Sequence, residues 1–232
     1  MRIFNMQQGS LEWAKLRCGK ITMSRAKDLL TGGKGITRMN YIFDVVAERL
    51  SGEPIDGYYG IDMERGNFLE EWAINALQEH LNVDVQTIGF VCLDKDDRIG
   101  CSPDGLIEGY KAGVEIKCPK PRQHIKNALY DGFNDYAAQV QGQMWICEKD
   151  HWYLASFCPW VKQMPLHVLR LERNDEIIKK LSESALNAAD TVDEIVKEAT
   201  TQQPLLSSVA AIADEARDAW DNVLADNDQV QI

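Results

Sequence analysis

Two short stretches constrain this chain more than any other feature: "SPDG" at residues 102–105 and "VEIKC" at residues 114–118. Side chains alternate faces along a strand, so Glu115 and Lys117 point to one side while Val114 and Ile116 point to the other. An acidic turn carrying Asp104 precedes Glu115 by eleven residues. If the two segments pair as a hairpin, Asp104 and Glu115 lie side by side, next to the amine of Lys117.

Such a pair of carboxylates has a specific chemistry. Two carboxylates a few ångströms apart repel, and each raises the pKa of the other unless a cation lies between them. Mg²⁺, or Mn²⁺ in its place, suits oxygen ligands, and the carbonyl of Ile116 could supply a further one. Lys117 could orient or deprotonate a water, or stabilise charge on a phosphate. These residues predict metal-assisted phosphodiester hydrolysis, although an exposed hairpin with a surface salt bridge explains them equally well.

A third acid lies on a helix predicted over residues 65–81. Glu70 shares the apolar face of this helix with residues three, four and seven positions further on: Ala73, Ile74 and Leu77. A buried carboxylate needs a partner, because an unpaired buried charge is costly. We therefore expect Glu70 to face the metal. The alternative is a glutamate at the edge of the core, paired with a lysine.

A polar row marks another helix, predicted from about Asp135 to Cys147. Its polar face holds Tyr136, Gln139 and Gln143, and its other face holds Ala137, Val140 and Met144. A row of amides on an otherwise apolar helix suits holding a phosphate or a water. A stripe that simply faces solvent is the alternative.

The order of expected elements predicts an α/β fold with one central mixed β-sheet flanked by helices. Near the N-terminus we expect a helix from Ser10, interrupted at Gly19, and a second helix capped by Thr22 or Ser24. We expect a single domain over residues 1–232, with an acidic helical region from about residue 175.

The net charge of −11 does not exclude a nucleic-acid partner, because residues 181–232 alone carry a net −9. Bases gather instead around the suspected site: Arg17, Lys20, Arg25, Lys27, Lys117, Lys120, Arg122 and Lys126. The chain shows no apolar run of the roughly 18 residues that a membrane span needs, no signal-peptide pattern and no C-x-x-C pair. We expect a cytoplasmic protein with reduced cysteines.

Several blocks, in one order, extend the D…E-x-K pattern: "QGSLEWAKLRCGKITMS", "RGNFLEEWA", "CSPDGL", "EIKCP", "AQVQGQMW" and "WYLASF". From about Gln8 to Glu172 the chain resembles the phage lambda-type exonuclease family of the PD-(D/E)XK superfamily. The resemblance implies a restriction-endonuclease-like core. It also implies that Asp104 and Glu115 bind metal, that Glu70 assists them, and that Lys117 is the catalytic lysine.

The same resemblance assigns residues to the DNA. It implies that the 5′-terminal phosphate is held by Arg17, Ser24 and Ser102, that Gln139 lies by the scissile group, and that Tyr136 is a site tyrosine. A planar, always-charged guanidinium suits a phosphate. Trp13 lies one helical turn before Arg17, where it could contact DNA or simply pack.

The activity that the resemblance implies is Mg²⁺-dependent 5′→3′ digestion of one strand of linear double-stranded DNA, which leaves 3′ single-stranded tails. It further implies a homotrimeric ring, a single-strand-annealing partner protein, and a phage or prophage gene expressed in a bacterial cell. The acidic C-terminal region resembles the family only loosely. An endonuclease or DNA-structure-specific nuclease of the same superfamily is one alternative, and a non-catalytic DNA-end binding module is another.

Overall fold

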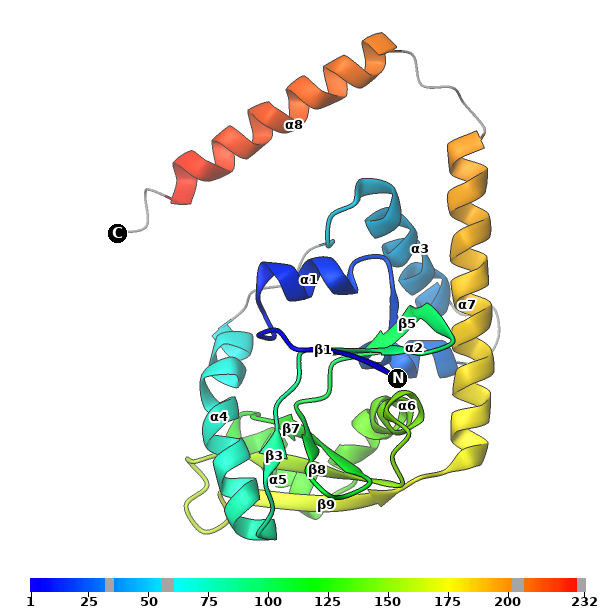
Figure 1. The fold of residues 1–232 in the computed structure, drawn as a ribbon. Helices are drawn as coiled ribbons and strands as arrows, with labels where there is room; N and C mark the ends of the chain where they lie inside the picture. The colour runs from blue at the N-terminus through cyan, green and yellow to red at the C-terminus, as the bar shows by residue number, and fades with distance from the viewer. Residues whose placement is uncertain (32–35, 56–60, 202–206, 229–232) are drawn as a thin grey trace. The chain divides into compact units, whose positions relative to one another are not determined.

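The computed structural model describes residues 1–31, 36–55, 61–201 and 207–228 (Figure 1). The segments "TGGKGITRMN" at residues 31–40 and "SGEPIDGYYG" at residues 51–60, both predicted from the sequence as loops, lie partly outside these ranges, and from Ile36 the first of them is helical. The chain divides into two compact units, Met1–Asp193 and Glu194–Ile232. All the residues considered for the site belong to the first unit. The expectation of a single domain stays a prediction.

A five-stranded mixed sheet carries the hairpin. Its order is β3 (Val85–Gln86), β6 (Gly105–Ile107), β7 (Ala112–Lys117), β8 (His151–Phe157) and β9 (Leu166–Glu172). β7 runs parallel to β8, and the other neighbours are antiparallel. The sheet is therefore mixed, as the sequence predicts.

A second, four-stranded mixed sheet has the order β1 (Arg2–Phe4), β4 (Phe90–Leu93), β5 (Asp96–Cys101) and β2 (Ile21–Thr22). Mixed sheets flanked by helices confirm the α/β class, but the strands form two sheets where the sequence led us to expect one. The chain passes from β5 to β6 through Pro103, which has no N–H to donate to a ladder. The strand run therefore breaks there, and the two halves join different sheets.

Six α-helices of the first unit surround these sheets: α1 (Leu11–Arg17), α2 (Ala26–Leu30), α3 (Ile36–Ser51), α4 (Ile61–Leu81), α5 (Pro121–Leu129) and α6 (Ala137–Cys147). The apolar face of α4 packs on the five-stranded sheet, where Leu69, Ala73 and Leu77 join Val114 and Ile116 in one core cluster. This packing turns Glu70 towards the end of β7.

α6 lies between the two sheets (Figure 1) and contacts β4 and β5 on one side and β7 and β8 on the other. A helix enclosed in this way buries side chains all round, and most of α6 from Val140 to Cys147 is buried, including Gln141 and Gln143. The polar row that the sequence indicates on this helix is therefore not a solvent-facing stripe.

The N-terminal region confirms one expected cap and corrects the other. Ser10 caps α1, and its hydroxyl accepts a hydrogen bond from the Trp13 N–H at 3.2 Å. Neither Thr22 nor Ser24 caps a second helix. Thr22 belongs to β2, its hydroxyl and that of Ser24 lie 3.1 Å apart, and a short 3₁₀ turn (Met23–Arg25) precedes α2.

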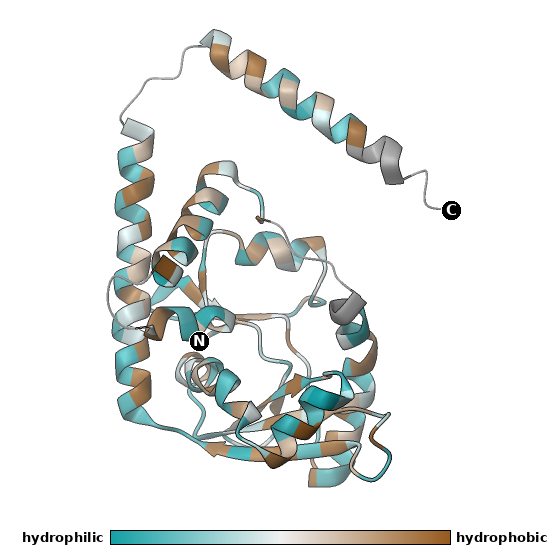
Figure 2. Cartoon of the chain, turned by 180° about the vertical axis from the view of Figure 1, so that it is seen from behind, coloured by the Kyte–Doolittle hydropathy of each residue, from teal (hydrophilic) through white to brown (hydrophobic). Residues whose placement is uncertain are grey.

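The acidic region is helical in its described part. α7 (Asp175–Thr201) begins in the first unit, where it buries an apolar stripe that includes Ile178, Leu181 and Val192. α8 (Ser207–Asp228) belongs to the second unit, and hydrophobic and hydrophilic residues alternate along it (Figure 2). None of the helices in the described ranges is both long and apolar enough to cross a membrane.

Candidate active site

The predicted hairpin forms, and its register brings the two carboxylates together. β6 and β7 are antiparallel, with Gly105 opposite Val114, so Asp104 and Glu115 are the next residues to face each other. Oδ2 of Asp104 accepts a hydrogen bond from the N–H of Ile116 at 2.5 Å. The Glu115 residue is only 2% exposed. A surface salt bridge on a solvated hairpin does not describe this arrangement.

Lys117 points to the same side as Glu115, as strand alternation requires. Its Nζ lies 2.5 Å from Oε1 of Glu115 and 4.9 Å from the centroid of the Tyr136 ring. Burial alone would lower the pKa of Lys117, but the charges of Glu115 and Asp104 outweigh it and raise this pKa above its usual value. The two carboxylates thus stabilise the charged form of Lys117 beside them.

Two amides of α6 hold the Glu115 carboxylate. The Nε2 of Gln139 donates to Oε1 at 2.7 Å, and the Nε2 of Gln143 donates to Oε2 at 2.6 Å. Gln143 is 1% exposed, and its Oε1 has no hydrogen-bond partner within the described part of the chain. The sequence placed both glutamines in one row but assigned a role to Gln139 alone. Their spacing of four residues, which puts them on one helical face, was the available signal.

Glu70 lines the same cavity as Asp104, Glu115 and Lys117, at the position that its helical face predicts. The cavity holds about 320 Å³ and is lined by Gly66, Asn67, Glu70, Asp104, Glu115, Ile116, Lys117, Cys118, Pro119 and Tyr136. Burial, then the charge of Glu115, raises the pKa of Glu70. Burial, then the charges of Glu115 and Glu70, raises the pKa of Asp104 well above its usual value. We call Glu70, Asp104 and Glu115 the carboxylate corner.

The donor chemistry of the carboxylate corner fits Mg²⁺ or Mn²⁺. Among the residues described, no three His, Cys, Asp or Glu side chains converge into a ready metal-ligand cluster. Mg²⁺ does not need one, because it usually takes one or two carboxylates and keeps several waters. Asp104 and Glu115 are such a pair, with the carbonyl of Ile116 beside them. Burial, and then the neighbouring charges of Glu115 and Glu70, raise the pKa of Asp104, and a cation beside these carboxylates would favour their charged forms.

A second group of side chains forms what we call the arginine corner: Trp13, Arg17 and Ser102. The Ser102 hydroxyl accepts from Nη1 of Arg17 at 2.9 Å and from Nε1 of Trp13 at 3.0 Å. The Arg17 guanidinium lies 4.1 Å from the centroid of the Trp13 ring, and burial lowers the pKa of Arg17. Trp13 thus packs against Arg17 and positions Ser102.

The turn between β5 and β6 joins the two corners, since Ser102 and Asp104 are two residues apart. The Gln8 side chain fixes this turn, because its Nε2 donates to the carbonyls of Pro103 and Ile88, each at 2.9 Å. No role was predicted for Gln8, which only begins the first resembling block. Its two hydrogen bonds help to set the spacing between the arginine corner and the carboxylate corner.

Ser24 lies apart from these contacts. It is exposed, and its hydroxyl contacts Thr22, whose backbone N–H donates to the Tyr41 hydroxyl at 2.7 Å. Tyr41 is near enough to Arg17 to affect the pKa of that guanidinium. Among the described residues no hydrogen bond joins Ser24 to Arg17, and its phosphate contact stays a prediction.

The model of the YqaJ-like viral recombinase domain matches residues 12–150, more than half of the chain. The chain belongs to this family. The matched span contains every residue of both corners. An uncharacterized protein of Escherichia coli K12 named ExoD is 36% identical over 63 residues, which are 27% of this chain and 72% of that protein.

Solved structures agree with this family. An alkaline exonuclease from Laribacter hongkongensis superposes with a TM-score of 0.76 at 26% identity, over 82% of this chain and 96% of its own. A phage-related exonuclease from Haemophilus somnus 129PT superposes at 0.66 and 18% identity, over 80% and 98% of the two chains, and shows the fold alone. The resemblance to lambda-type exonucleases and the PD-(D/E)XK fold are thereby confirmed. A viral recombinase family also fits a phage or prophage origin.

Proposed function

We propose that this protein is a Mg²⁺-dependent exonuclease that digests one strand of linear double-stranded DNA in the 5′→3′ direction from 5′-phosphorylated ends. One observation carries the proposal: the carboxylate corner and the arginine corner lie on one turn, joined through Ser102 and Asp104. The family and the fold support a lambda-exonuclease-like nuclease. The metal, the polarity and the 5′-phosphate preference belong to the proposal.

The division of labour follows from the contacts. Asp104, Glu115 and the carbonyl of Ile116 would hold the metal ion, with Glu70 beside them. When bound, the ion supplies Lewis-acid polarisation of the phosphoryl group and a more acidic water. Gln139 and Gln143 keep the Glu115 oxygens oriented.

The amine of Lys117 lies against Glu115 and would orient or deprotonate a water, or stabilise charge that develops on the phosphate. A fixed ammonium in a water-poor site stabilises negative charge that develops on the phosphate. The Tyr136 ring stands against the same ammonium and lines the cavity, where it would contact the scissile group.

The arginine corner explains why the enzyme would work from an end. A terminal phosphate carries more charge than an internal phosphodiester, and a desolvated guanidinium beside a hydroxyl favours it. Holding that phosphate at Arg17 and Ser102 places a linkage close to Asp104. Cleavage would then release nucleotides one after another, which leaves a 3′ single-stranded tail.

Strand polarity on labelled duplex tests the proposal. Linear duplex labelled at the 5′ or the 3′ end of one strand is incubated with the protein in Mg²⁺ or in EDTA and resolved on a sequencing gel. We expect a 5′ label to leave at once as a mononucleotide, a 3′ label to move down through a ladder, and EDTA to stop both. Cleavage of a closed circular duplex would instead establish an endonuclease, and a duplex left intact in Mg²⁺ would establish an end-binding module.

Two partners complete the proposal. The resemblance to the lambda-type exonucleases implies a homotrimeric ring around duplex DNA and a single-strand-annealing protein that receives the 3′ tail, and we propose both for this chain. Light scattering during size-exclusion chromatography checks the first, with three times the 26.2 kDa chain mass as the expected result. Co-elution with an annealing protein encoded beside this chain checks the second.

A further inference from the structure

The helix α5 buries polar side chains and exposes apolar ones. Its buried side chains are polar, His124 and Asn127, whereas Ile125 and Leu129 are exposed, Leu129 at 64%. An amphipathic helix normally turns its apolar stripe to the core. Apolar side chains held outward in a row indicate a surface that binds something.

Hydrogen bonds fix this orientation. The ring of His124 bonds through Nδ1 to the Ser156 hydroxyl at 2.8 Å and through Nε2 to the Met164 carbonyl at 2.7 Å. Nδ2 of Asn127 donates to the same hydroxyl at 3.3 Å. The buried polar groups are thus satisfied against β8 and the loop that follows it. Rotating α5 to bury Ile125 and Leu129 would break all three bonds, so the exposed face is a fixed part of the fold.

The exposed face is also cationic. Residues 116–130 contain four bases and no acid, in a chain whose net charge is −11: Lys117, Lys120, Arg122 and Lys126. Arg122 and Lys126 stand one helical turn apart on the exposed side, and Tyr130 follows one turn later with 73% of its surface exposed. We call this row the α5 strip: Arg122, Ile125, Lys126, Leu129 and Tyr130.

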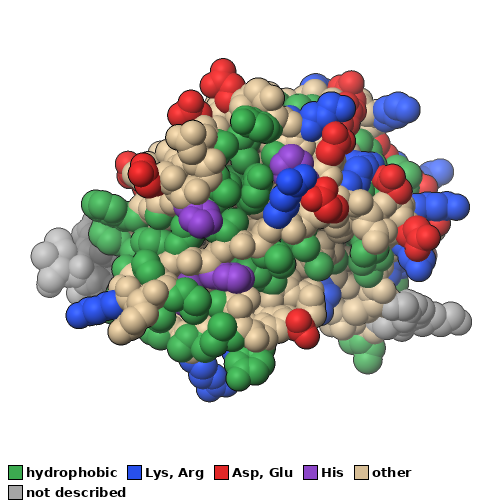
Figure 3. All heavy atoms as spheres, turned by 90° about the horizontal axis from the view of Figure 1, so that it is seen from below, with side chains coloured by type: hydrophobic (Ala, Val, Ile, Leu, Met, Phe, Trp, Pro, Cys, Tyr) green, Lys and Arg blue, Asp and Glu red, His purple; other side chains and the backbone are tan. Residues whose placement is uncertain are grey.

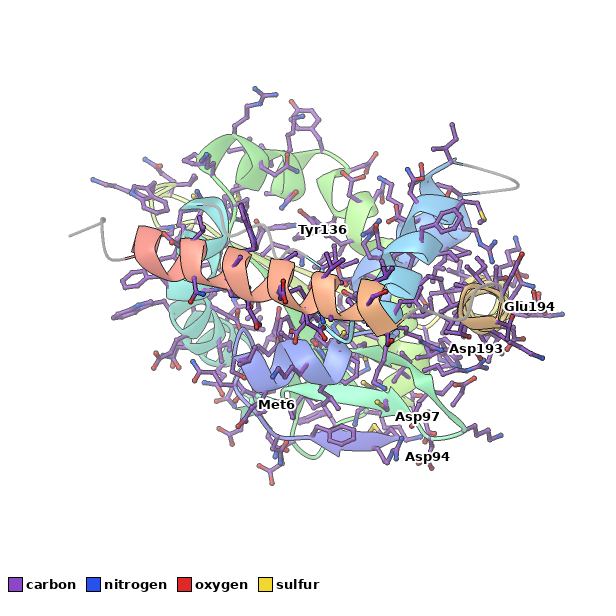
Figure 4. All side chains as sticks on the ribbon, turned by 90° about the horizontal axis from the view of Figure 1, so that it is seen from above. Met6, Asp94, Asp97, Tyr136, Asp193 and Glu194 are labelled. Atoms are coloured by element: carbon purple, nitrogen blue, oxygen red, sulfur yellow. The ribbon has the colours of Figure 1, made fainter. Side chains whose placement is uncertain are left out.

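The α5 strip starts at the active site. The residues just before α5, Cys118 and Pro119, line the cavity, and after α5 the chain returns to the cavity at Tyr136. In the view from above, side chains of this green helix point outward, away from the body of the molecule (Figure 4). A strand that leaves the site beside Lys117 would meet this surface next.

We propose that the α5 strip binds single-stranded DNA next to the active site. Arg122 and Lys126 would pair with phosphates, and Tyr130, with Leu129 and Ile125 around it, would receive the faces of unpaired bases. Cations interleaved with aromatic and apolar side chains are the usual surface for single strands, because every base has a face that can stack. A duplex hides those faces and offers only phosphates, so the apolar half of the strip selects an unpaired strand. The inference rests on the proposed function for the source of that strand.

Binding in the absence of hydrolysis tests this inference. Fluorescence anisotropy of labelled oligothymidylate is measured with the full chain in EDTA over a range of salt concentrations, and a blunt hairpin duplex serves as the second probe. The stacking variant is Tyr130→Ala, matched by Tyr110→Ala, an exposed tyrosine at the β6–β7 turn. The charge variant is Arg122→Gln/Lys126→Gln, matched by Lys95→Gln/Lys111→Gln, two exposed lysines in other turns.

We expect Tyr130→Ala to weaken oligothymidylate binding about tenfold, in the range of a lost base stack. The charge variant should weaken it too and reduce the slope of log affinity against log salt by about 1.4, because two phosphate contacts are lost. Both control variants should bind within about twofold of the wild type. Thermal melting confirms that all variants fold, which their exposed positions favour.

Three results would overturn the inference. The strip variants could bind oligothymidylate as the wild type does, or lose duplex and single strand equally. Tyr130→Ala could also leave oligothymidylate binding intact and change the assembly mass, which would make the strip a contact between copies of the chain. Because these measurements need no cleavage, their failure leaves the digestion assay of the proposed function untouched, and the reverse also holds.

Discussion

The two corners of the site differ in the charge that each one lacks: the carboxylate corner is rich in negative charge, and the arginine corner carries a positive charge. In the carboxylate corner, burial and then the charges of Glu115 and Glu70 raise the pKa of Asp104. In the arginine corner, burial lowers the pKa of Arg17, and its guanidinium contacts the Ser102 hydroxyl and the Trp13 ring. We propose that a metal ion completes the carboxylate corner and that a phosphate completes the arginine corner. A DNA end that binds together with a metal ion would supply both missing charges, the cation to the carboxylate corner and the anion to the arginine corner.

The surroundings of the two corners differ as well. Away from the site, ionic groups pair among themselves: Arg98 bonds Asp96, Asp190 and Asp193, which ties β5 to α7. The labelled side chains Asp94, Asp97 and Asp193 lie well away from Tyr136 (Figure 4). The underside of the molecule gathers apolar side chains on one half and mixed charges on the other (Figure 3). The paired charges around Arg98 thus contrast with the two corners of the site.

The largest expected effect comes from removing the cation of the carboxylate corner. Lys117→Ala should lower the rate of duplex digestion by about 10²- to 10⁴-fold, since the lost amine acts on the reacting group. Binding of a 5′-phosphorylated duplex in EDTA should change little, because Arg17 and Ser102 are intact. Single-turnover digestion and anisotropy measure the two quantities.

A matched variant sharpens this result. Lys111→Ala removes an exposed lysine at the other end of β7, paired with Asp150 at 3.6 Å, and should digest duplex as the wild type does. If Lys117→Ala turned over normally, the ammonium beside Glu115 would have no part in the chemistry.

Next in size is the loss of the guanidinium from the other corner. Arg17→Ala should slow digestion of 5′-phosphorylated ends by about 10- to 100-fold, the worth of a charge-assisted hydrogen bond to phosphate. Ends that carry a 5′-hydroxyl should be affected far less, since they offer no terminal phosphate. The ratio of the two rates isolates end recognition from catalysis.

Arg17→Lys supplies the control, because it keeps the charge but loses the planar fork, and it should recover only part of the preference. Equal losses on both kinds of end would show that Arg17 serves the fold or general DNA binding and not the terminal phosphate.

Local periodicity predicted the carboxylate corner well. Strand alternation put Glu115 and Lys117 on one side, and the helical stripe of Ala73, Ile74 and Leu77 turned Glu70 inward. Both patterns involve only a few neighbouring residues, so they can be recognised without knowing how distant segments of the chain pack. The α/β class followed from the order of such elements.

Contacts between distant segments could not be read in this way. Gln143 reaches Glu115 from 28 positions away, and Arg17 reaches Ser102 from 85 positions away. The helical spacing separates Gln143 from Gln141, but no local pattern shows that Gln143 faces β7 and Gln141 faces the start of α7. The split into two sheets depends on the same kind of long-range packing.

A smaller effect is expected from the amide that holds Glu115. Gln143→Leu removes the donor to Oε2 while keeping the volume, and the freed carboxylate should bind metal about tenfold more weakly, as when other partners of metal ligands are lost. Mn²⁺ binding, followed by electron paramagnetic resonance, reports this directly, and the Mg²⁺ concentration for half-maximal digestion should rise in parallel.

Gln141→Leu is the matched control in the same helix. Gln141 is equally buried, but its amide donates to the Glu172 carbonyl at 2.8 Å, away from the site. This variant should lower the melting temperature and leave Mn²⁺ affinity unchanged. A fall in affinity common to both variants would indicate loosening of α6 rather than a specific hold on Glu115.

The smallest expected effect is a pH dependence of stability confined to the carboxylate corner. The pKa values of Asp104 and Glu70 are raised in the folded protein, so between the unfolded and the folded pKa the native state holds more protons than the unfolded one. Stability from these groups is therefore complete at low pH and is lost as pH rises through the folded pKa.

Asp104→Asn keeps an oxygen for the Ile116 N–H and removes the charge, so in EDTA its melting temperature should exceed that of the wild type by a margin that grows with pH. Added Mg²⁺ should stabilise the wild type and close that margin, because the ion supplies the charge that the corner lacks. Arg17→Ala should show no such pH-dependent margin over the same range, since no carboxylate repulsion is relieved there, and a margin that stayed constant with pH in Asp104→Asn would mean that Asp104 does not carry the surplus charge.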